Sequence, residues 1–286
     1  MNRKPGFLLA CCCACGSVHA TSLPGANIAN GIASSEWPGV GALIVRVGGG
    51  YGQCTATLIS PTWVLTAAHC LQDSSNPQDY SFVPQADYSC CTASGGLAVA
   101  SIAANPQYDT LAHDQGLVQL AAPLAGITPL IVNDQAPPGV GSYLHLLGYG
   151  ITQAGGNTLK QLGLVRVSSF DATTLSFDSG PTYAQACQGD AGAPSFNYAP
   201  NGFPLVHATF SYGSSPTCSM STFEVSSRTD SDIGWIRAHA SDACVRSAPS
   251  GSGCDGIFRN GIDSLAIAPA APVVTLQPAG VSPSGR

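Results

Sequence analysis

Short apolar stretches separated by glycine, proline and polar turns run through most of the chain. Residues 42–47 are apolar apart from one arginine, end at three successive glycines, and are followed by a second apolar stretch at 56–59. Two such stretches around a glycine turn predict a β-hairpin. Residues 72–94 are polar and turn-rich, which predicts a surface loop. The apolar stretch at 205–210 is equally short, so the pattern indicates strands.

The composition favours the same interpretation. Of 286 residues, 33 are glycine, 21 are proline and only 9% are charged, which argues against long amphipathic helices. The length suits one large all-β domain or two modest ones. The formal net charge is −6 and the few lysines and arginines are scattered, so no basic stripe is available for a phosphate backbone. We therefore expect no nucleic-acid partner.

The first twenty residues have the pattern of a secretory signal peptide. Arg3 and Lys4 precede an apolar stretch at 7–15, and residues 18–20 suit cleavage after Ala20. A lipoprotein signal ending before Cys11 is the alternative, but its apolar core would hold only about four residues where about 7–15 are usual. We expect a secreted protein, extracellular or periplasmic.

The remaining chain has no apolar run near the roughly 18 residues of a membrane helix, so we expect no membrane partner. Eight cysteines follow the signal segment: Cys54, Cys70, Cys90, Cys91, Cys187, Cys218, Cys244 and Cys254. An even number in an exported protein favours disulfides. No pair of CxxC motifs, and no CxxC with HxxxH, has the spacing of a zinc finger, so we expect no metal and no cofactor.

Five motifs follow one another along the chain: TWVLTAAHC at 62–70, HDQGLVQL at 113–120, LLGYG at 146–150, CQGDAGAP at 187–194 and SYG at 211–213. Their order and spacing resemble the trypsin- and chymotrypsin-like serine proteases, whose motifs read WVLTAAHC, NDIALLKL, GWG, GDSGGP and SWG. The resemblance extends from residue 28 to about residue 240. It implies an all-β fold of two six-stranded antiparallel β-barrels, chymotrypsin-like, with a short C-terminal helix.

The resemblance also divides the chain. Residues 1–20 are the signal peptide, 21–27 a short propeptide, 28–243 the trypsin-like peptidase domain, and 244–286 a flexible tail rich in proline, alanine and serine. A compact island at 254–261 resembles short C-terminal motifs of exported bacterial proteins that act as sorting tags. An inert tail is the alternative.

The catalytic residues that the resemblance implies are His69 as the base, Asp114 as the carboxylate that orients it, and Ala191 at the position of the nucleophile. A methyl group has no lone pair with which to attack a carbonyl. Ser195 is the nearest hydroxyl, but we expect it in a strand, out of reach of His69. His113 is expected at the surface or in packing, because neighbouring strand residues face opposite ways.

The same loop implies an oxyanion site and an activation site. The backbone N–H groups of Gly189 and Ala191 are the expected oxyanion donors, since losing a side-chain hydroxyl leaves the amides in place. Asp190 is the expected partner of a new amino terminus at Ile28, released by cleavage after Asn27. Ala193 replaces the second glycine of the family motif, and its effect on the loop is left open.

The substrate-binding residues implied are Gln185, Ser211, Tyr212 and Gly213. Gln185 falls at the base of the specificity pocket, where a preference for Lys or Arg needs a carboxylate, so a neutral pocket is expected. The strand ending at Gly213 offers backbone hydrogen bonds to an extended peptide.

Among the cysteines, Cys54–Cys70 and Cys187–Cys218 match disulfides of the family. Cys244–Cys254 is the simplest remaining local pair, and the partners of Cys90 and Cys91 stay open.

Three functions fit these residues. The first is a secreted, monomeric pseudoprotease that keeps His69 and Asp114 and binds a peptide or protein without cleaving it. The second is a serine endopeptidase whose serine was lost from this sequence by engineering or error. The third is an adhesin-like surface protein in which residues 249–286 are the working part.

Overall fold

The computed structural model describes Ile28 and residues 30–89, 95–151, 158–180, 182–199, 202–214 and 223–247. The proposed signal peptide, propeptide and most of the tail lie outside these residues, as do Cys90, Cys91, Cys218 and Cys254. None of the described helices is long and apolar enough to span a membrane.

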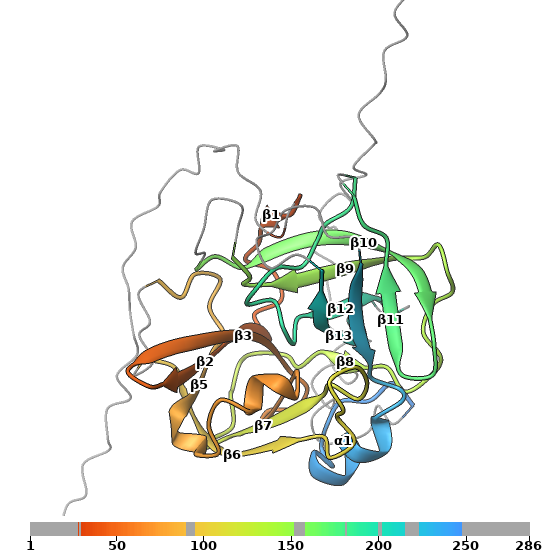
Figure 1. Cartoon of the computed structure of the whole chain (residues 1–286). Coiled ribbons are helices and arrows are strands. Elements are labelled where there is room, and N and C mark those ends of the chain that lie inside the picture. Colours follow the sequence, from red (N-terminus) through yellow and green to blue (C-terminus); the bar gives the residue numbers. More distant parts are fainter. Residues whose placement is uncertain are drawn as a thin grey trace, which may run out of the picture.

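The first barrel closes from six antiparallel strands in the order β2-β3-β4-β7-β6-β5 (Figure 1, orange to yellow). Their bounds are β2 Val40–Val47, β3 Gly50–Leu58, β4 Trp63–Thr66, β5 Tyr80–Val83, β6 Leu97–Ala104 and β7 Gly116–Leu120. Alternate residues of these strands, among them Leu43, Val45 and Leu58, fill the interior.

The predicted hairpin is confirmed as β2 paired with β3. Its two-residue loop is Gly48-Gly49, and both residues have positive φ, of 53° and 92°. Glycine is favoured there because a two-residue loop matched to the strand twist needs left-handed backbone at both positions.

The prediction of a surface loop at 72–94 is wrong for β5. Tyr80 and Phe82 point into the barrel and are almost fully buried, and β5 pairs with both β2 and β6. The polar residues around this four-residue strand masked its apolar pattern. A short 3₁₀ turn, η2 Pro77–Asp79, leads into it.

The second barrel also closes from six antiparallel strands, in the order β9-β10-β11-β14-β13-β12 and back to β9 (Figure 1, green to blue). Their bounds are β9 Tyr143–Gly148, β10 Gln161–Phe170, β11 Thr174–Phe177, β12 Pro194–Tyr198, β13 Pro204–Gly213 and β14 Glu224–Arg228. Two short strands extend the sheet: β1 Ile32–Ala33 on β10 and β8 Ile131–Val132, parallel, on β13.

The short helix α1, Ile233–His239, follows β14 and covers the outside of the first barrel (Figure 1). Its fully buried residue Ile236 packs with Ile59, Leu65 and Leu117. The two six-stranded barrels and the C-terminal helix confirm the predicted chymotrypsin-like fold.

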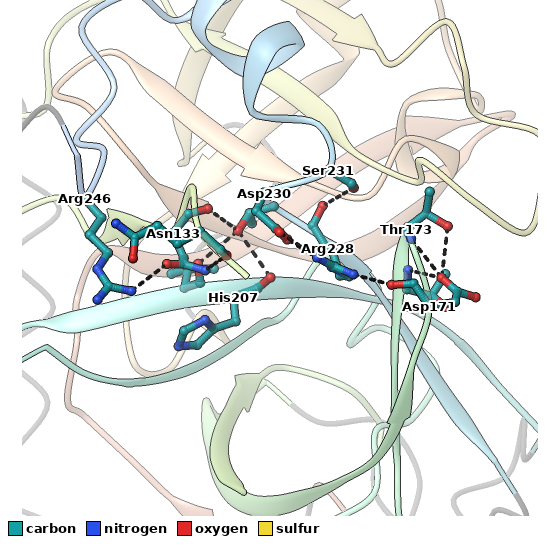
Figure 2. Close-up of polar contacts among 12 residues, drawn as sticks. Asn133, Asp171, Thr173, His207, Arg228, Asp230, Ser231 and Arg246 are labelled. Carbon is teal, nitrogen blue, oxygen red and sulfur yellow. Dashed lines mark hydrogen bonds and ion pairs between the residues drawn. The ribbon is translucent and has the colours of Figure 1, made fainter. Parts of the chain in front are cut away.

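Polar contacts hold the end of β14 in place (Figure 2). Arg228 forms an ion pair with Asp230 at 2.6 Å and donates to the carbonyl of Asp171. The hydroxyl of Thr229 lies 2.8 Å from the carbonyl oxygen of Asn133, whose side chain accepts a hydrogen bond from Arg246. The strand that begins at Glu224 is therefore anchored at its far end.

Candidate active site

His69 and Asp114 lie side by side between the two barrels. His69 begins the 3₁₀ turn η1, His69–Leu71, directly after β4, and Asp114 precedes β7, the neighbour of β4. Nδ1 of His69 lies 2.7 Å from Oδ2 of Asp114, and the backbone N–H of His69 donates to Oδ1 at 2.9 Å. The hydroxyl of Ser211 donates to Oδ2 at 2.5 Å. Three donors therefore surround one buried carboxylate.

Asp114 is suited to stay ionised. Burial acts to raise its pKa, but the hydrogen bond and charge of His69 and the hydrogen bond from Ser211 outweigh burial, so the pKa of Asp114 lies below its usual value. A carboxylate bonded to Nδ1 holds the imidazole in one orientation and leaves Nε2 to accept a proton. The geometry is that of a base with its orienting group.

Ala191 lies in the tight loop before β12 and is 9% exposed. Its side chain packs in the core cluster of the first barrel with Cys70 and Leu71. Gly192, at φ 82°, allows the loop to pass close to the first barrel, because a Cβ there would lie 2.3 Å from the carbonyl oxygen of Thr55. The side chain at 191 ends in a methyl group and offers no nucleophile.

Thr55, on β3, connects the first barrel to this loop. Its backbone N–H donates to the carbonyl oxygen of Ala191 at 2.8 Å, and its hydroxyl donates to the carbonyl oxygen of Gly189 at 3.1 Å. The backbone N–H of Tyr149 donates to the same hydroxyl at 3.1 Å. Sequence reasoning missed this fully buried residue, since its three partners are distant along the chain.

Gly189 and Ala191 keep their backbone donors available. Within the described ranges, neither N–H has an acceptor in the protein, whereas the N–H groups of Asp190, Gly192 and Ala193 are all bonded to backbone carbonyls. Gly189 has φ 96°, a conformation natural to glycine. Two unpaired amides beside the site are the type of group that holds an oxyanion.

Ala193, which replaces the second glycine of the family motif, fits the loop. Its side chain is fully buried in the core of the second barrel, and its N–H donates to the carbonyl of Asp190 at 2.7 Å. Its φ is not positive, so an alanine needs no strained backbone here.

Asp190 is fully buried next to two glycines. Its carboxylate accepts the N–H of Gly150 at 2.7 Å and of Cys187 at 2.8 Å. A Cβ on Gly148 or Gly150 would come within 2.1 or 2.2 Å of a carboxylate oxygen. Burial raises the pKa of Asp190 to about 7. No described residue forms an ion pair with it.

Ile28, the expected partner of Asp190, lies in the core of the second barrel. Its side chain is fully buried in the cluster that also holds Ala184 and Val165. A Cβ on Gly163 would touch Ile28 at 3.0 Å, so a glycine makes room for this residue. The structure therefore buries the side chain of Ile28 in the same barrel that carries Asp190.

Gln185 is buried, and its amide donates to the carbonyl of Gly180 at 3.0 Å. Ser211, Tyr212 and Gly213 end β13, where a bulge after Phe210 turns Ser211 toward Asp114. Gly213 pairs with Glu224, the first residue of β14. Glu224 is fully buried, and sequence reasoning missed it; the available signal was a glutamate inside an otherwise small and uncharged strand.

Ser195 and two further histidines lie elsewhere. Ser195 is on β12, fully buried, and its hydroxyl has no hydrogen-bond partner among the described residues. His145 packs against the rings of Phe196 and Tyr198. His207 bonds to Asn197 at 2.8 Å. Where the structure describes the chain, none of the three is hydrogen-bonded to His69.

Cys54 and Cys70 form the predicted disulfide, which braces the turn that carries His69. Cys187 and Cys244 are disulfide-bonded as well, while Cys218 and Cys254, their expected partners, lie outside the described residues. The ligand atoms of Cys54, His69 and Cys70 lie within 4.8 Å of one another, but the two sulfurs are bonded to each other and are not metal-binding thiolates.

Three proteins illustrate what the chain is similar to. It is 29% identical over 238 residues to transmembrane protease serine 9 of Rattus norvegicus, covering 74% of this chain and 22% of that protein. It is 31% identical over 189 residues to coagulation factor XII of Sus scrofa, covering 55% and 30%. Chymotrypsin-like elastase family member 1 of Macaca fascicularis is 26% identical over 236 residues, covering 71% and 84%. The chain spans less than a third of the first two relatives.

The family model described as Trypsin matches residues 32–241, and the chain therefore belongs to the trypsin family of serine proteases.

Proposed function

We propose that this protein is a secreted pseudoprotease, which binds a peptide or protein in its groove and does not cleave it. The observation that carries the proposal is the pairing of an ordered His69–Asp114 dyad with a methyl group at Ala191. Nucleophilic catalysis requires a hydroxyl whose proton the imidazole can take. Here the base has its orienting carboxylate and no such proton to take.

The size of the expected loss supports an inactive protein. Removing a triad serine costs on the order of 10⁶ in turnover, and the remaining groups supply only about 10³–10⁴ over the reaction in water. Slow residual hydrolysis of that size has no practical use as proteolysis.

Binding remains available. The unpaired amides of Gly189 and Ala191 are suited to hold a carbonyl oxygen, and the end of β13 is suited to pair with an extended peptide. A disulfide next to His69 and the signal-like first twenty residues support an extracellular or periplasmic location, and we propose that the protein acts there as a monomer.

Restoring the hydroxyl tests this proposal. Wild type, Ala191→Ser and the double variant Ala191→Ser/His69→Ala, each cleaved so that Ile28 is the first residue, are compared on labelled casein. We expect hydrolysis from Ala191→Ser alone, on the order of 10⁶ above wild type. The double variant shows whether the activity passes through His69.

Two results contradict the proposal. Covalent labelling of the wild-type cleft by a serine-directed phosphonate would reveal an active nucleophile. An Ala191→Ser variant that folds and remains inactive would mean that the missing oxygen is not what separates this site from catalysis.

A further inference from the structure

Four side chains outside the proposed groove gather where the segment between β1 and β2 meets the second barrel. Tyr198 ends β12, and its ring centroid lies 5.8 Å from that of Trp37 and 5.4 Å from that of His145. His145 comes from β9, which pairs with β12 (Figure 1). Glu36 directly precedes Trp37 and is exposed. These four residues, which we call the Trp37 cluster, come from three separate segments of the chain.

Solvent reaches the rings of the Trp37 cluster. Tyr198 is 44% exposed, and Trp37 and His145 are partly exposed. Trp37 also has φ 50°, an uncommon left-handed conformation for so bulky a residue. Two bonds to its carbonyl oxygen hold the backbone there, one from the N–H of Val40 at 2.9 Å and one from Nζ of Lys160 at 3.0 Å. An indole kept at the surface by a strained backbone points to a role beyond packing.

The charges around the rings favour a cation. No described residue forms an ion pair with Glu36. Burial outweighs the nearby charge of Glu36 and lowers the pKa of His145, so this imidazole is uncharged at neutral pH and does not repel a cation. Lys160 is itself fully buried, and its Nζ donates to the carbonyl oxygens of Trp37 and Val40. The carboxylate of Glu36 therefore remains available to a ligand.

We propose that the Trp37 cluster binds a small quaternary ammonium compound, at a site separate from the proposed peptide groove. The faces of aromatic rings attract a cation through their π electrons, and the carboxylate beside them adds opposite charge. A quaternary ammonium has no N–H group and needs no hydrogen-bond acceptor, which suits a surface of rings with one carboxylate. A primary ammonium is strongly hydrated and loses more on leaving water.

Titration of the full-length protein with choline tests the proposal. The indole N–H signal of Trp37 in the NMR spectrum, identified by its loss in Trp37→Phe, reports binding. The uncharged isostere 3,3-dimethyl-1-butanol is the matched ligand, and ethanolammonium is the cation without methyl groups. Choline should bind about tenfold more tightly than either of them.

Variants assign the effect to the side chains of the cluster. Tyr198→Leu removes one ring and Glu36→Gln removes the charge, and each should weaken choline binding about threefold. Tyr198→Phe keeps the ring and should bind as wild type does. Tyr51→Leu is the matched control, since Tyr51 lies on β3, is 65% exposed and is not part of the cluster.

Equal affinity of wild type for choline and its uncharged isostere would overturn the proposal, because binding would then be apolar contact alone. Ethanolammonium binding as tightly as choline would also overturn it, since the rings would then add nothing to the charge of Glu36. Unchanged binding in Tyr198→Leu, or equal weakening in Tyr51→Leu, would do the same. None of these results depends on residue 191 or on hydrolysis, so failure of this inference is distinguishable from failure of the pseudoprotease proposal.

Discussion

His113 and Asp232 form an ion pair between Nδ1 and Oδ1 at 2.5 Å, across 119 residues of sequence. His113 directly precedes Asp114, and Asp232 directly precedes α1. The pair thereby joins the loop that presents Asp114 to the helix that closes the fold. His113 also has φ 56°, an uncommon left-handed conformation for a residue other than glycine, which this contact helps to hold.

Replacing His113 by Asn should destabilise the protein. Asparagine tolerates left-handed backbone, so the change removes the ion pair and leaves Asp232 fully buried without its partner. We expect a loss of about 2 kcal/mol in the free energy of unfolding, below the full cost of breaking a buried pair because His113 is partly exposed. Urea denaturation measures it. Adding Asp232→Asn should recover part of the loss, and full additivity of the two changes would show that the pair is not coupled.

Gly150→Ala should disturb the site of Asp190. The new Cβ would lie 2.2 Å from Oδ2 of Asp190, and the fully buried carboxylate has no open space into which to move. Overpacking of this kind costs about 1–3 kcal/mol. Gly139→Ala is the matched control, since nothing lies within 4 Å of its Cβ. Equal thermal denaturation of the two variants would contradict the close packing of the Asp190 carboxylate.

Stability should fall as the pH rises through neutrality. The pKa values of Asp190 and Glu224 are raised in the folded protein to about 7 and about 8, from 3.8 and 4.5. Between those values the folded state holds more protons than the unfolded state, so the free energy of unfolding decreases with pH. Their stabilising contribution is complete below the unfolded values and is lost by about pH 8.

Thermal denaturation between about pH 5 and pH 8 measures this slope. Glu224→Gln should flatten it and Glu36→Gln should leave it unchanged, because Glu36 is exposed. Stability of wild type that stays level or increases over this range would argue against two buried, largely protonated carboxyl groups.

Ser195 should have no part in any hydrolysis. In Ala191→Ser, the further change Ser195→Ala should leave kcat on casein within about twofold, because the hydroxyl of Ser195 is buried in β12 and has no hydrogen-bond partner in the described part of the chain. A loss of activity comparable to that of His69→Ala would show that Ser195 reaches the base.

The sequence motifs were sufficient for the fold and for the proximity of His69 and Asp114, since each motif fixes a strand and a turn together. They were not sufficient for Glu224, whose surroundings come from β11, β13 and the loop near Ala186. The ion pair between His113 and Asp232 could likewise not be predicted from the sequence. The expected strand alternation does not apply there, because β7 begins only at Gly116 and His113 lies in a left-handed turn. Contacts of this kind depend on which distant segments meet, and local pattern does not encode that.

Thr55 donates hydrogen bonds to the backbone carbonyls of Ala191, from its N–H, and of Gly189, from its hydroxyl, so the shape of this loop does not depend on the side chain of residue 191. Alanine and serine codons differ by a single base. One nucleotide change would therefore place an oxygen in a loop that packs against the turn carrying His69, so a hydroxyl at this position is a short evolutionary step away.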